Sequence, residues 1–193
     1  LNYMSEYPDY DAENNSLRII ENKLLKQALK SDYNRKELLT TFLSIRNYRL
    51  QYLEKEITKF EEKGEIYEGL ASYIDTQIGD WIYYHTDQLS QEIKGYFKNI
   101  NVEINKYLDF KKPNEKTLNI VKRWYCNGYV LGNIADQIIP EWKEYMDENP
   151  MIWRNLFSIK ITQLPPVDKI LKDEDYDSIL KEMKQKELKQ KNK

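Results

Sequence analysis

Four polar residues between positions 65 and 75 have the spacing of one helix face. Glu65, Glu68, Ser72 and Asp75 are separated by three or four residues, and residues at this spacing are neighbours on a helix surface. The segment 69–72, GLAS, consists mostly of small residues. Small side chains allow two helices to approach closely, so that a carboxylate such as Glu68 can reach a shared metal ion at about 2 Å. The pattern is therefore compatible with a metal-ligating carboxylate on this helix.

Charged residues on the preceding helices are candidates to support such a site. Glu21 interrupts an apolar helical stripe, so it is either a carboxylate that supports the site or a helix-flank residue with a salt partner. Arg46 and Arg49 can hold Glu21 or Glu68 through bidentate hydrogen bonds. The alternative for the two arginines is a solvated helix face.

Residues that other kinds of catalytic site need are scarce. His85 is the single histidine and Cys126 the single cysteine, and no G-x-S-x-G, H-E-x-x-H or glycine-rich phosphate loop occurs. Zinc enzymes usually need two or three imidazole or thiolate ligands, which this chain does not contain. His85 is interpreted as a surface or junction histidine, and the aromatic run 81–84 as core or interface.

The segment EGLASY at residues 68–73 resembles the E-G-[LF]-A-x-Y segment of gluzincin-type (zincin-like) zinc metallopeptidases, including aminopeptidases of the NEGFASYVE type. In that family the glutamate of this segment is the third zinc ligand, and an upstream H-E-x-x-H helix supplies two histidines. The resemblance therefore implies that Glu68 is a metal ligand. The competing interpretation is a chance match in which the small residues serve only helix packing.

The order of other segments is also similar to a group of bacterial zincin-like proteins. YPDYDAENN, the helix with Glu21, the arginine helix, EGLASYI and WYCNGYVLGNIADQIIPEWK follow one another between about residue 7 and residue 145. In those proteins an H-E-x-x-H helix immediately precedes the Pro-Asp-Tyr-Asp-like loop, so it is expected before Leu1. The resemblance places Tyr125 or Tyr129 at the cleft as the tyrosine that stabilises the oxyanion. The residues expected to support Glu68 are Glu21, Arg46, Arg49, Glu65 and Ser72.

On this interpretation the chain is the C-terminal part of a zinc metallopeptidase that hydrolyses peptide or protein substrates with a zinc-activated water. We expect zinc in the intact protein, and neither tight zinc binding nor hydrolysis by this chain alone, because the helix with two ligands and the general base is missing. Two alternatives remain. One is a non-catalytic helical binding module or degenerate peptidase-like scaffold, and the other is a structural domain from a mobile element or envelope protein.

The elements that must position these residues are helices. Gly and Pro are scarce, with six of each among 193 residues, which favours long helices over turn-dense sheets. We predict an all-α, multi-helix bundle that resembles the C-terminal helical part of a zincin-like domain. Residues 1–165 are expected to form one domain, followed by a C-terminal helix and basic tail over 166–193. Apolar spacing predicts helices at 17–29, 34–64, 65–78, 88–108, 115–139, 140–147, 151–161 and 173–190.

Composition excludes several classes of function. The formal net charge of −2 provides no electrostatic attraction for nucleic acid. The sequence contains no run of about 18 apolar residues, the length that a membrane-spanning helix needs, so a soluble domain is expected. The single cysteine excludes an intrachain disulfide. The chain starts with Leu1 instead of methionine, which suggests that a segment preceded it.

Overall fold

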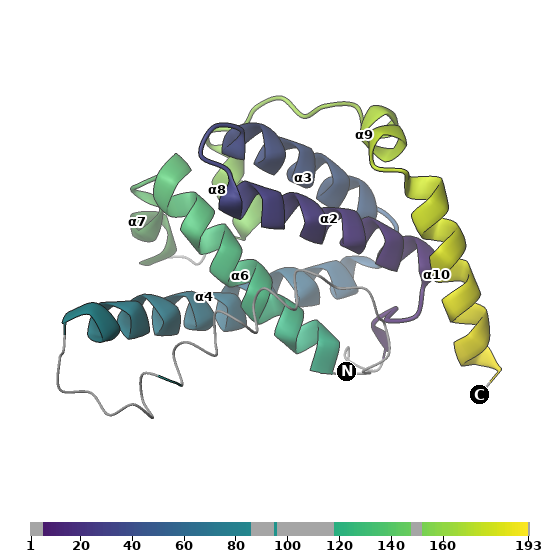
Figure 1. Cartoon of the computed structure of the whole chain (residues 1–193), viewed down its shortest axis with the longest axis horizontal. Helices are drawn as coiled ribbons and strands as arrows, with labels where there is room; N and C mark the ends of the chain where they lie inside the picture. Colours follow the sequence, from purple (N-terminus) through teal and green to yellow (C-terminus); the bar gives the residue numbers. More distant parts are fainter. Residues whose placement is uncertain (1–5, 86–94, 96–117, 148–151, 193) are drawn as a thin grey trace.

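The computed structural model describes residues 6–85, 95, 118–147 and 152–192. Within these ranges every regular element is an α-helix, and the helices pack into a bundle (Figure 1). This confirms the predicted all-α class. No helix in this part of the chain combines the length and apolar character that a membrane crossing requires.

Helices α2 (Ala12–Lys30) and α3 (Arg35–Leu50) lie side by side and supply much of the core. The Asp11 side chain begins α2 by accepting a hydrogen bond of 2.6 Å from the Asn14 backbone N–H, which satisfies a donor that has no partner within the helix. Apolar residues of both helices are fully buried, among them Ile20, Leu25, Leu39 and Ile45. The predicted helix at 17–29 is confirmed, with a start five residues earlier.

Helix α4 (Lys55–His85) differs from the prediction at both ends. The sequence pattern predicted helix ends at Gly64 and Gly79, but α4 continues through both glycines. A glycine ends a helix mainly by adopting positive φ, and no described glycine has positive φ. Gly64 instead makes room for a neighbour, because a Cβ there would overlap the Trp124 indole. The break falls at residues 51–54, between α3 and α4, and no glycine or proline marks it.

Helix α6 (Leu118–Ile138) crosses α4 with the two backbones in contact (Figure 1). A Cβ on Gly69 would lie 2.5 Å from the Gly128 Cα and 2.8 Å from the Trp124 carbonyl oxygen. One helix turn further along α6, a Cβ on Gly132 would meet the Tyr73 ring at 2.6 Å. The small residues of EGLASY therefore do form a close helix crossing, and the partner helix supplies matching glycines.

The remaining helices cover the two ends of this arrangement. Helices α7 (Trp142–Asp147) and α8 (Trp153–Ser158) bring Trp142, Trp153 and Phe157 into the core. The predicted helix at 173–190 corresponds to α10 (Tyr176–Lys191), and the helix before it, α9 (Val167–Asp173), was not predicted. They are separated at Asp175, whose φ of 54° is left-handed. Helix α9 packs on α3 and α10 packs on α2. The predicted helix at 88–108 lies outside the described residues.

The Gly69–Gly128 crossing predicts a strong cost for one added methyl group. Gly69→Ala should lower the free energy of unfolding by about 1–3 kcal/mol, because the new Cβ overlaps backbone atoms of α6 that cannot rotate away. Chemical denaturation of both proteins measures the difference. Gly95→Ala is the matched control, since nothing lies within 4 Å of a Cβ there, and it should be neutral or stabilising by up to about 1 kcal/mol. An unchanged stability of Gly69→Ala would show that the helices can separate at little cost.

Candidate functional site

Glu68 lies half-buried on α4, beside the crossing with α6. The phenol of Tyr125, from α6, lies close to the Glu68 carboxylate. Interaction with this carboxylate is the main cause of a raised pKa for Tyr125, because losing the phenolic proton would place a second negative charge beside it. The structure therefore brings together Glu68 and Tyr125, two residues that the sequence singled out and that are 57 positions apart in the chain.

Other residues of the predicted polar face lie in different surroundings. Ser72 is half-buried, and its carbonyl oxygen accepts a hydrogen bond from the Thr76 hydroxyl. Asp75 is exposed. Tyr129 lies one turn beyond Tyr125, and its pKa is raised by burial and by the negative charge of Asp80. Tyr125 is thus the tyrosine whose pKa responds to Glu68.

Glu65 is not on a shared polar face with Glu68, which corrects the interpretation of the sequence. Glu65 is almost completely buried and turns toward Arg46 of α3. The Arg46 Nη2 atom lies 2.9 Å from Glu65 Oε1 and 2.9 Å from Glu21 Oε2. The Arg46 guanidinium also lies over the Phe42 ring, at 4.7 Å from its centroid. One arginine therefore joins carboxylates from α2 and α4 inside the bundle.

Arg49, one turn further along α3, makes a second junction of the same kind. Its Nε atom donates to Glu21 Oε1 at 2.6 Å, and its Nη1 atom donates to Glu61 Oε2 at 3.1 Å and to Asn14 Oδ1 at 3.0 Å. Glu21 is therefore held by both arginines, as one sequence interpretation proposed, and the alternative of a solvated helix face is wrong for Arg46 and Arg49. The sequence analysis offered Glu68 as the other carboxylate that the arginines could hold. Their further carboxylate partners are Glu61 and Glu65 instead.

Helix α6 and the loop before α2 complete this ion-pair network. The Tyr7 hydroxyl donates to Glu61 Oε2 at 2.6 Å and accepts from Arg123 Nη2 at 2.9 Å. The Asn127 amide donates to Glu65 Oε1 at 2.7 Å. Glu65 is one helix turn before Glu68, and Asn127 is two residues beyond Tyr125. The network thus fixes both helices directly beneath the Glu68–Tyr125 pair.

The network keeps its carboxylates ionised in spite of burial. Burial alone would raise the pKa of Glu21, but the positive charges of Arg46 and Arg49 outweigh it and hold the pKa below the ordinary value of 4.5. For Glu61 the opposing effects are again burial and arginine charge, now from Arg49 and Arg123, and its pKa lies well below 4.5. These two carboxylates are therefore anionic at neutral pH and serve as fixed counter-charges.

The described residues do not assemble a metal site by themselves. No group of three or more His, Cys, Asp or Glu side chains among them is placed to hold a metal ion. Glu21, Glu61 and Glu65 are engaged by arginine, and His85 is exposed, with Nδ1 2.9 Å from the Trp81 carbonyl oxygen. Glu68 is half-buried beside Tyr125, so a zinc ion at Glu68 would need its remaining ligands from elsewhere.

Five residues of the network were not singled out from the sequence: Tyr7, Asn14, Glu61, Arg123 and Asn127. Glu61 stands one helix turn before Glu65, so the spacing alone could have grouped them. Tyr7 and Arg123 are 116 positions apart, and no pattern in the sequence links them. Comparisons of the chain with protein-family models, with curated proteins and with solved structures found no match in any of the three. Fold and site therefore define a class only, an all-α bundle with a carboxylate–tyrosine pair above a buried ion-pair network.

Removing one carboxylate from the network should destabilise the protein strongly. Glu61→Gln removes one of the two carboxylates that Arg49 contacts and the carboxylate that pairs with Arg123, and breaking a buried pair in this way costs about 3–5 kcal/mol. Urea denaturation measures the loss. Glu56→Gln is the matched control on the same helix, because Glu56 is exposed and paired only with Lys59, and no measurable change is expected. Equal stabilities of the two variants would contradict the assignment of the network.

The lowered pKa values also predict acid sensitivity. A carboxylate whose pKa is lower in the folded than in the unfolded protein adds stability above its unfolded pKa, and this stability is lost as pH falls through the folded value. Glu21 and Glu61 should therefore make the free energy of unfolding decline below pH 4.5. Glu62, whose pKa is raised by burial, acts in the opposite direction. Because it lacks one buried carboxyl group whose pKa is lowered, Glu61→Gln should show a shallower decline than the parent in parallel denaturation series. Identical slopes would contradict the prediction.

Proposed function

We propose that this chain is the helical C-terminal part of a zincin-like metallopeptidase domain, in which Glu68 provides one zinc ligand and a segment bearing H-E-x-x-H provides the others. The observation that carries the proposal is that the Glu68 carboxylate and the Tyr125 phenol face each other beside the closest approach of α4 and α6. The EGLASY resemblance assigns the same glutamate to the metal, and the order of the other segments places Tyr125 or Tyr129 at the cleft.

The chain's own contribution on this proposal is to hold a carboxylate in place. A ligand must be fixed to within a fraction of an ångström to serve a metal site. The glycine crossing fixes the separation of α4 and α6, and the ion-pair network fixes the turn of α4 that precedes Glu68. The Tyr125 hydroxyl restrains the carboxylate from the opposite helix. The glycine crossing, the ion-pair network and Tyr125 all restrain the position of Glu68, and this favours a functional role for Glu68 over simple helix packing.

The test is a metal analysis of the full-length gene product. If that product contains H-E-x-x-H ahead of the present chain, it should bind zinc, and Glu68→Ala should weaken zinc binding by more than the roughly 10–100-fold that loss of a supporting residue costs. Peptide hydrolysis should be lost together with the metal. Glu56→Ala, an exposed carboxylate nearer the start of α4, should leave both unchanged.

Two results would overturn the proposal. One is a full-length product without paired histidines ahead of this chain. The other is a Glu68→Ala protein that binds zinc as tightly as the parent. The second candidate, a non-catalytic helical binding module, would then be preferred, and the exposed aromatic residues Tyr67 and Trp81 on α4 favour it. Circular dichroism of Glu68→Ala should match the parent, because Glu68 is not part of the ion-pair network.

A further inference from the structure

The outer face of α4, opposite the face that packs on α6, is unusually apolar. Four large side chains on it are exposed, Tyr67 by 65%, Ile74 by 49%, Ile78 by 51% and Trp81 by 61%. Ala71 is also exposed, and His85 stacks on Trp81 with ring centroids 5.1 Å apart. Contiguous exposed apolar surface on one helix is typical of an interaction site. We call these six residues the outer stripe: Tyr67, Ala71, Ile74, Ile78, Trp81 and His85.

The outer stripe has a symmetric spacing. Ile74 and Ile78 lie equally far from position 76, and so do Ala71 and Trp81, and so do Tyr67 and His85. A helix with such a pattern can pair with an antiparallel copy of itself about a two-fold axis at position 76. The side chains of the second pair are complementary in size, since the smallest residue of the stripe, Ala71, meets the largest, Trp81. Interfaces between two identical subunits require this kind of self-complementary surface.

We propose that the outer stripe is the interface of a homodimer, in which α4 packs antiparallel against α4 of a second copy of this chain. Ile74 contacts Ile78 of the other copy on both sides of the axis, and Trp81 covers Ala71. The proposal concerns a surface that faces away from α6 and does not depend on the proposed metal site.

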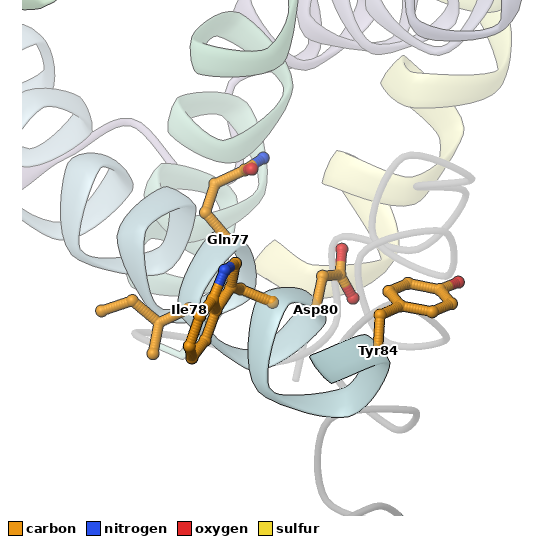
Figure 2. A pocket seen from close by; sticks show the side chains of 5 residues that line it. Gln77, Ile78, Asp80 and Tyr84 are labelled. Carbon is orange, nitrogen blue, oxygen red and sulfur yellow. The ribbon is translucent and has the colours of Figure 1, made fainter. Parts of the chain in front are cut away.

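The residues that flank the outer stripe favour the dimer on one side of the helix and weaken it on the other. In an antiparallel pair of identical helices, each flank faces the same flank of the second copy. One flank carries Leu70 and Gln77, which are uncharged, and next to it lies a hollow of about 480 Å³ at the end of α4. Figure 2 shows Ile78 and Tyr84 at the two ends of this hollow, with Gln77 and Asp80 between them. Leu70 of the second copy would lie at the level of this hollow. The other flank carries Asp75, which would face Asp75 of the second copy and repel it.

The dimensions of the outer stripe set the strength of the dimer. Nineteen residues from Tyr67 to His85 span about 28 Å at 1.5 Å per residue. A footprint of about 28 Å by 10 Å is smaller than the roughly 800 Å² that each partner buries in a standard interface. Together with the repulsion at Asp75, this makes the dimer weak and dependent on concentration.

Sedimentation of the 193-residue chain at micromolar to near-millimolar concentrations tests the proposal. The average mass should rise toward that of a dimer with concentration, and Ile78→Asp should raise the dissociation constant by at least about tenfold. Asp75→Asn should lower it. Leu188→Asp is the matched control, because Leu188 is a similarly exposed apolar residue on α10, and it should change nothing. All three positions are exposed, so each variant is expected to fold, and circular dichroism verifies this.

Chemical cross-linking tests the antiparallel register. In a mixture of Tyr67→Cys and His85→Cys proteins, a short bismaleimide should join the two variants to each other but neither to itself, and Cys126 is buried. A chain that stays monomeric at all concentrations would overturn the proposal, as would Tyr67→Cys cross-linking to itself or an equal effect of Leu188→Asp. A monomer that binds a helix from another protein, or from a further part of the same gene product, through the outer stripe would also overturn it.

Discussion

Arg46 and Arg49 lie inside the bundle with almost all of their surface removed from water, and an unpaired charge in that position would cost several kcal/mol. The arrangement of the neighbouring helices follows from this constraint. Glu21 must come from α2, and Glu61 and Glu65 must come from α4, in positions where their oxygens meet the two guanidinium groups. Such a network adds little net stability compared with an apolar core, but it penalises any shift of one helix relative to the others.

The position of the candidate site follows from the same constraint. Glu65 and Asn127 hydrogen-bond to each other inside the bundle, and they precede and follow the pair formed by Glu68 and Tyr125 on the same two helices. A rotation of α4 that turned Glu68 away would also withdraw Glu65 from Arg46. The buried charges and the half-buried carboxylate are therefore coupled through the helix that carries both.

Much of the fold could be predicted from the sequence, because the apolar spacing of α2 and α6 and the small residues of EGLASY report local requirements. The boundaries of α3 and α4 could not, since Gly64 and Gly79 look like helix ends when their neighbours are unknown. Trp124, 60 positions away, is the reason for the glycine at 64. For the site, the sequence singled out Glu68, Tyr125, Glu21 and both arginines. It expected Glu65 on a polar face, because charge on a helix is usually exposed, and only the positions of Arg46 and Asn127 show that this glutamate is buried.

The contact between Gly69 and Gly128 has a mechanical consequence. When one helix tilts against another, the atoms beside their closest contact move least. Glu68 and Tyr125 lie beside this contact, whereas Trp81 and His85 lie several turns further along α4. A tilt of α4 against α6 would therefore displace the carboxylate and its tyrosine less than the far end of the helix. A carboxylate that must keep its aim and a surface that must adapt to a partner can thus share one helix.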